Sequence, residues 1–182
     1  MIKNKNVVKA LVLAAGFWGM QSATHAVDSA SLEIGSGNKT QLARVGLQWK
    51  WDSKWWQSNG THIGGHWDLT LSQWRADRFH NIPGNSQNLI DIGFTPVFRL
   101  QNDNLKGWYL EGGIGAHYLS KVYDNNDRQF STKFQFGDHL GVGYVFLNNL
   151  DVGLKIQHFS NGSFKQPNDG TNFAVLRASY AF

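Results

Sequence analysis

Apolar and polar residues alternate along most of the chain after Val27, with the period of two that is typical of β-strands. Clusters of Gly, Asn, Asp and Pro interrupt this alternation at short intervals and predict turns. No segment shows a sustained helical period. The pattern predicts an all-β fold, an eight-stranded antiparallel barrel connected up and down. The expected strands are 29–36, 42–52, 61–76, 88–101, 107–122, 130–146, 151–161 and 171–182.

The lengths and number of these segments favour a barrel that spans a membrane. Several exceed the roughly 9–11 residues that cross a bilayer when tilted, and eight is the smallest common strand number in outer-membrane barrels. The last strand ends in Phe182 with Tyr180 on the same face, which resembles the C-terminal signature of such barrels. Both termini are then periplasmic, so 77–87, 123–129 and 162–170 are expected to be external loops.

The first 26 residues match the three-part pattern of a secretory signal peptide. Lys3, Lys5 and Lys9 precede an apolar run over 10–20, and Thr24-His25-Ala26 offers small residues for cleavage. The run is too short to span a bilayer. We therefore expect an exported protein with a single transmembrane barrel domain over 27–182, and we exclude nucleic acid as a partner.

The composition of the chain excludes several kinds of site. The mean hydropathy of −0.38 hides the apolar band of a barrel, because polar residues alternate with apolar ones. The absence of cysteine excludes disulfides, a thiol nucleophile and a thiolate metal site. No metal site is predicted, since the spacing of the histidines fits no zinc pattern. Interface belts are the expected place for Trp49, Trp51, Trp55, Trp56, Trp67 and Trp74.

Strand 151–161 carries the candidate chemistry. Its apolar positions share one face, which must contact lipid, and that same face continues to His158 and Ser160 near the outer leaflet. A hydroxyl and an imidazole two residues apart on one face suit a nucleophile and its general base. The alternative is an interfacial His and Ser without chemistry.

A triad needs a third group that orients the imidazole, and two residues qualify. Asn172 opens the last strand on the same outward face. Asp138 interrupts the outward apolar row of strand 130–146, and a three-residue hairpin loop at 147–149 would place it beside His158. The loop 161–170 adds Asn161 and Asn168 as candidate donors to an oxyanion, although both also suit ordinary turns.

The motif His158-Phe159-Ser160-Asn161, followed by Pro167-Asn168-Asp169-Gly170 and a short last strand, resembles the lipid A 3-O-deacylase family, PagL. The resemblance implies an outer-membrane serine esterase that hydrolyses the 3-position acyl ester of lipid A and releases a 3-hydroxy fatty acid. It implies no cofactor, with His158 as base, Ser160 as nucleophile and Asn168 as an oxyanion donor. The chain departs from the family at Asn172, where a Glu can complete the triad.

Three functions remain open at this point. The first is the esterase, whose partner is lipid A within lipopolysaccharide. The second is a non-enzymatic outer-membrane barrel, serving as an adhesin or envelope-stability protein. The third is a soluble lipid carrier of lipocalin type, which predicts an apolar interior and a polar exterior. The net charge of +4 fits solvated loops or attraction of Lys165 or Arg128 to lipid phosphates. A homodimer is also considered.

Overall fold

The computed structural model describes residues 26–182, and the regular structure in this part is entirely strand. The predicted signal peptide lies, apart from Ala26, outside the described residues and stays a prediction. No helix in the described part is long and apolar enough to cross a membrane. The strands are β1 Ser29–Gly37, β2 Thr40–Lys50, β3 Trp55–Ser58, β4 Thr61–Ala76, β5 Gln87–Asn102, β6 Gly107–Leu119, β7 Asp124–Asn125, β8 Arg128–Gln129, β9 Phe134–Val145, β10 Leu150–Ser160 and β11 Thr171–Ala181.

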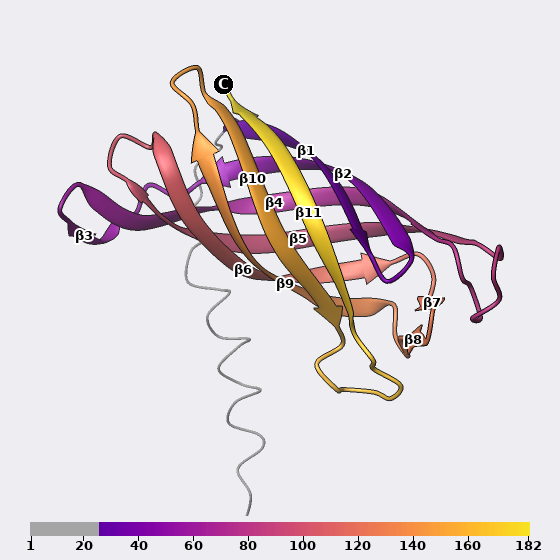
Figure 1. Cartoon of the computed structure of the whole chain (residues 1–182). Coiled ribbons are helices and arrows are strands. Elements are labelled where there is room, and N and C mark those ends of the chain that lie inside the picture. Colours follow the sequence, from indigo (N-terminus) through magenta and orange to yellow (C-terminus); the bar gives the residue numbers. More distant parts are fainter. Residues whose placement is uncertain (1–25) are drawn as a thin grey trace, which may run out of the picture.

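Eight long strands close into a barrel. Each pairs antiparallel with its neighbours in the order β2-β1-β11-β10-β9-β6-β5-β4, and the pairing of β2 with β4 closes the ring (Figure 1). The predicted eight-stranded antiparallel barrel is therefore confirmed. Of the three short strands, β3 extends a hairpin with the start of β4, while β7 and β8 form a small hairpin of their own.

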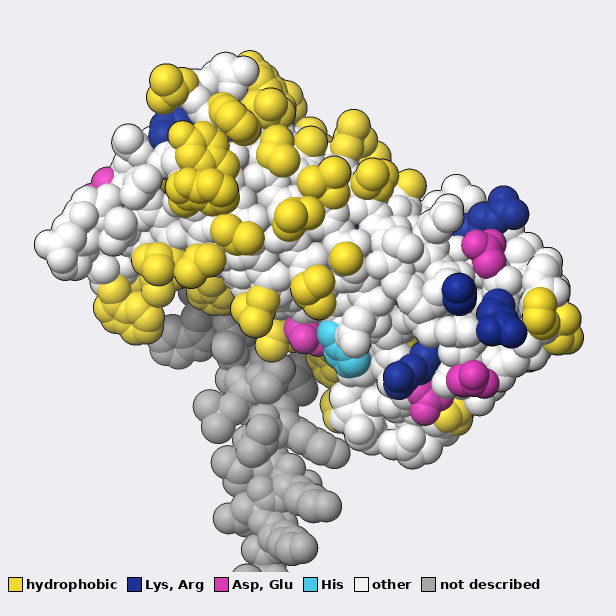
Figure 2. Space-filling model, viewed as in Figure 1, with side chains coloured by type: hydrophobic (Ala, Val, Ile, Leu, Met, Phe, Trp, Pro, Cys, Tyr) yellow, Lys and Arg dark blue, Asp and Glu magenta, His cyan; other side chains and the backbone are white. Residues whose placement is uncertain are grey.

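The alternation seen in the sequence separates an apolar outer wall from a polar interior. Outward side chains such as Leu32, Leu71 and Ile156 are exposed, and apolar groups cover the strand-bearing wall in Figure 2. The interior holds buried ion pairs, with Arg44 Nη1 at 2.9 Å and Lys155 Nζ at 2.7 Å from the Glu33 carboxylate. An apolar outside around a polar inside suits a wall that faces lipid. It is the reverse of what a lipocalin requires.

The loop-bearing end of the interior is closed by an aromatic cluster. Trp74, Phe159 and Phe173 pack edge to face, with ring centroids 4.7 to 5.9 Å apart. Trp74 is fully buried, and its indole N–H donates to Ser72 Oγ at 3.0 Å. The prediction that Trp74 lies in an interface belt is wrong, because even-numbered positions at this end of β4 point inward.

The segment 120–133 between β6 and β9 is a longer loop than predicted. Tyr123 and Phe130 turn back into the aromatic cluster, so Phe130 is not part of the strand expected over 130–146, and the strand expected over 107–122 ends at Leu119. The loops over 77–86, 120–133 and 161–170 lie at one end of the barrel and are joined by hydrogen bonds. For example, the Arg78 backbone N–H donates to Asn125 Oδ1 at 2.6 Å, and the Ser131 hydroxyl donates to the Lys165 carbonyl at 2.8 Å.

Candidate active site

His158 and Ser160 lie where β10 ends at the loop-bearing rim, and both point to the outer face. Their side chains are half-buried, whereas the intervening Phe159 is fully buried and Gln157 nearly so. Phe159 packs against Trp74 and against the His117 ring, at a centroid distance of 5.0 Å. This inward anchor fixes the strand on which the two polar side chains face outward, as the sequence pattern predicts.

Asn172 is the cross-strand neighbour of His158 and bonds to it directly. The distance from His158 Nδ1 to Asn172 Oδ1 is 2.6 Å. A carbonyl oxygen only accepts, so Nδ1 carries the proton and donates it. The other ring nitrogen, Nε2, is then left with a free lone pair. An imidazole held in this tautomer is the form that can accept a proton from a hydroxyl.

Asp138 lies on the other side of the same histidine. It faces His158 in the register of β9 and β10, because the hairpin loop has the three residues 147–149 that the face match requires. Its side chain is half-buried on the outer face, and in residues 26–182 it forms no hydrogen bond or ion pair with His158. Asn172 and Asp138 therefore both lie next to the imidazole, and Asn172 is hydrogen-bonded to it.

The Ser160 hydroxyl has no hydrogen-bond partner in the part of the chain that the structure describes. Ser160 faces Phe136 of β9 in the sheet register, and no bond joins it to His158. Bonds between a nucleophile and its base often tighten only when substrate binds. The arrangement therefore places a hydroxyl and a base on one face without yet joining them.

The loop after β10 organises the two candidate donor residues differently. Asn168 Oδ1 accepts the backbone N–H of Asn161 at 2.9 Å. The Asn168 NH₂ group has no partner among the described residues, so it is free to donate. Asn161 is almost fully buried, and its own NH₂ donates to the Lys165 carbonyl at 2.8 Å and to Ser131 Oγ at 3.0 Å. This geometry favours Asn168 as the oxyanion donor and gives Asn161 a part in shaping the loop.

Gly170 is a residue that the sequence reasoning did not select. It adopts a φ of +66°, and a Cβ built on it would lie 2.5 Å from His158 Cε1 and 3.1 Å from Nε2. Only glycine fits against the imidazole here, both for space and for backbone conformation. Its place at the end of the turn Pro167-Asn168-Asp169-Gly170 was the available signal.

We expect Gly170→Ala to lower the turnover of any reaction that uses His158 by about tenfold or more. The added methyl group would displace the imidazole from the position in which it accepts a proton. Gly84→Ala is the matched control. Gly84 also has a positive φ, of +80°, but nothing lies within 4 Å of its built Cβ. Initial rates of both refolded variants make the comparison, and equal losses in both would show that backbone strain, rather than the imidazole, is responsible.

A closed eight-stranded barrel with an apolar wall defines an outer-membrane β-barrel protein, and the His-Ser pair on that wall adds a candidate esterase site. The model of the family Lipid A 3-O-deacylase (PagL) matches residues 41–181. The chain belongs to this family, and it is an outer-membrane protein.

Curated relatives and solved structures agree with this assignment. The lipid A deacylase PagL of Pseudomonas aeruginosa is 31% identical over 170 residues, which cover 91% of this chain and 92% of the relative. That of Bordetella bronchiseptica is 34% identical over 159 residues, covering 84% and 82%. The crystal structure of the outer membrane enzyme PagL superposes with a TM-score of 0.73 at 27% identity, covering 85% of this chain and 99% of the other. The N-terminal β-barrel domain of Pseudomonas aeruginosa OprF shares the fold alone, with a TM-score of 0.52 at 12% identity, over 87% of this chain and all of that domain.

Proposed function

We propose that this protein is a serine esterase of the outer membrane that hydrolyses the 3-position acyl ester of lipid A. The observation that carries the proposal is the bond between His158 Nδ1 and Asn172 Oδ1, two residues from Ser160 on the lipid-facing wall. Two curated relatives are named lipid A deacylase, which supports the substrate class. A site on the outer wall admits a substrate that is itself a membrane lipid.

The residues support a two-step acyl transfer. His158 Nε2 takes the proton of the Ser160 hydroxyl while Oγ attacks the ester carbonyl. The Asn168 NH₂ group donates to the oxygen that becomes negative. Protonated His158 then gives the proton to the departing sugar O3 as the bond from the acyl carbon to this oxygen breaks, which leaves a free 3-hydroxyl on the sugar and an acyl-serine. Water, deprotonated by His158, attacks the acyl-serine. The bond from the acyl carbon to Ser160 Oγ breaks, His158 returns the proton to Oγ, and the 3-hydroxy fatty acid leaves.

The third group of the triad is divided between two residues in this proposal. Asn172 holds the imidazole and its tautomer but has no charge to stabilise the imidazolium. Asp138, the neighbour on β9, supplies a negative charge beside the ring, since directly opposite residues have Cβ atoms about 4.5–5.5 Å apart. All of these groups lie on one chain, so the site needs no residue from a second copy. The homodimer stays a prediction.

Mass spectrometry of lipid A incubated with detergent-refolded protein tests the proposal. The expected result is the loss of one 3-hydroxyacyl group, with the released acid in equal amount. If lipid A keeps its mass while circular dichroism and heat-modifiable migration show a folded barrel, the non-enzymatic barrel becomes the better description.

Asp138→Asn is expected to lower the rate of deacylation by about tenfold, because an interaction of about 1.4 kcal/mol with the imidazolium corresponds to that factor. The side chain keeps its size, so the fold is retained. Asp127→Asn is the matched control, because Asp127 is an exposed loop carboxylate away from His158 and Ser160. The measurement is the steady-state rate at saturating lipid A. An unchanged rate in Asp138→Asn would mean that Asn172 alone supports the imidazole.

A further inference from the structure

A shallow groove of about 690 Å³ lies on the outer wall beside the candidate site. It crosses β10, β11, β1, β2 and β4, and none of the candidate catalytic residues lines it. Small side chains make the depression at Ser36, Ala43 and Ala174, between the larger Ile34, Leu154 and Leu176. All six point outward, so the groove opens toward the membrane and not into the barrel.

The strand register orders the groove into two rows. The row toward the membrane centre is mostly apolar and consists of Leu154, Leu176, Ile34, Ala43 and Gln73, each paired with the next. The row toward the loops becomes more polar along its length and consists of Ala174, Ser36, Gln41 and Arg75. The groove is therefore amphipathic, with its polar row at the level where headgroups are expected.

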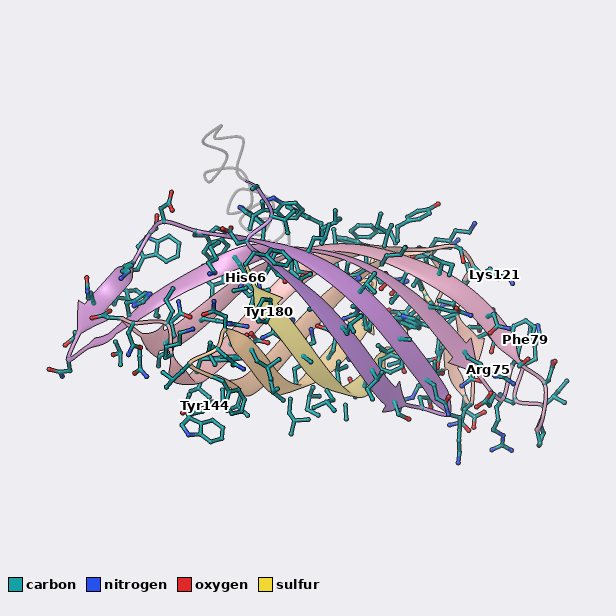
Figure 3. The ribbon with its side chains drawn as sticks, turned by 90° about the horizontal axis from the view of Figure 1, so that it is seen from above. His66, Arg75, Phe79, Lys121, Tyr144 and Tyr180 are labelled. Carbon is teal, nitrogen blue, oxygen red and sulfur yellow. The ribbon has the colours of Figure 1, made fainter. Side chains whose placement is uncertain are left out.

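Arg75 is the charged residue among those that line the groove. Its Nε lies 3.3 Å from Asp77 Oδ1, and its two Nη groups have no protein partner within residues 26–182. The side chain lies toward the loop-bearing end with Phe79 and Lys121, away from Tyr144 and Tyr180 (Figure 3). A guanidinium with two free N–H₂ groups suits bidentate binding of a phosphate.

The groove adjoins the candidate site along β10 and β11. Ala174 follows Asn172 by two residues on one face, and Ile156 precedes His158 in the same way. Three strand intervals separate Ala174 from Arg75, which at about 4.8 Å each amounts to about 14 Å. Ser160 lies one strand further, on β10, and four residues beyond Ile156, which pairs with Ala174, so a lipid that reaches both Ser160 and Arg75 must lie across the groove.

We propose that this groove binds the non-reacting part of a phosphorylated glycolipid, with a phosphate on Arg75 and an uncleaved acyl chain in the lower row. The inference rests on the proposed function, because the occupant is the lipid A whose ester reaches Ser160. Arg75 thus sets a preference for phosphorylated over dephosphorylated lipid A. It is a specificity residue and takes no part in the chemistry.

Kinetics with two substrates test the proposal. Arg75→Gln is expected to raise KM for phosphorylated lipid A by about tenfold, the factor for losing a charge-assisted hydrogen bond. Its kcat and its KM for dephosphorylated lipid A are expected to stay the same. Arg75→Lys, which keeps the charge without the fork, is expected to fall between. Lys121→Gln removes an exposed cation outside the groove and is expected to behave as wild type. Equal KM values for Arg75→Gln and wild type on both substrates would overturn the proposal.

A binding measurement separates this inference from the proposed function. Ser160→Ala protein in detergent micelles is titrated with each form of lipid A, and the affinity is measured with and without Arg75→Gln. Preferential binding of the phosphorylated form that depends on Arg75 supports the groove even if the wild type hydrolyses nothing. Binding without that preference contradicts the groove even if hydrolysis is observed.

Discussion

Ser160→Ala is expected to abolish release of 3-hydroxy fatty acid from lipid A, with a fall in rate of about 10⁴-fold or more. The substitution removes the nucleophilic oxygen, and no neighbouring hydroxyl shares its face of β10. It does not disturb packing, since the strand is anchored by the inward ring of Phe159. The measurement is the initial rate of acid release by mass spectrometry, with unfolding of the barrel followed in parallel.

Ser163→Ala provides the matched control for this variant. Ser163 is an exposed serine three residues further along the same chain segment, and its loss is expected to leave the rate unchanged. Wild-type activity in Ser160→Ala would place the nucleophile elsewhere and remove the basis of the mechanism.

Asn172→Asp is expected to raise the rate of deacylation by about tenfold or more. The new carboxylate occupies the place of the amide oxygen that accepts from His158 Nδ1 at 2.6 Å. A hydrogen bond to a charged acceptor is roughly twice as strong as a neutral one, and the gain appears when the imidazole becomes protonated in the transition state. Asn172→Glu, which introduces the acid expected from the family resemblance, is expected to act in the same direction. The measurement is kcat on lipid A.

Asn172→Ala separates orientation from charge. It removes the acceptor, so the imidazole loses its fixed tautomer and the rate is expected to fall below that of wild type. If Asn172→Ala and wild type were equally fast, the bond between the two side chains would have no part in the reaction. If Asn172→Asp gave no increase, Asp138 would already supply the charge that the imidazolium needs.

Much of the barrel could be predicted from the chain alone because strand alternation assigns each residue to a face. The outward position of His158 followed from the period of two along its strand. The outward position of Asp138 followed in the same way, because a three-residue loop at 147–149 matches the outer faces of the two strands. Trp74 was misplaced because composition, rather than its position in β4, decided the prediction. Whether a tryptophan belongs to a girdle or to the interior depends on parity and on the cluster that closes the end of the barrel.

Other features depend on contacts that no local pattern contains. Gly170 lies against His158 because the loop returns to the sheet with a particular backbone conformation. The groove near Arg75 depends on the register across five strands, from β10 to β4, which are distant in sequence. Such registers are set by the closure of the whole barrel. The sequence alone therefore does not predict which of these residues lie side by side in the groove.

The outward orientation of Ser160 has a consequence for how the enzyme meets its substrate. A lipid that is cleaved on the wall need not leave the leaflet, so the encounter is a lateral collision in two dimensions. Turnover should then depend on the mole fraction of lipid A among its neighbouring lipids, and diluting the membrane in buffer should leave it unchanged. Adding inert lipid to the leaflet should slow the reaction as effectively as removing substrate.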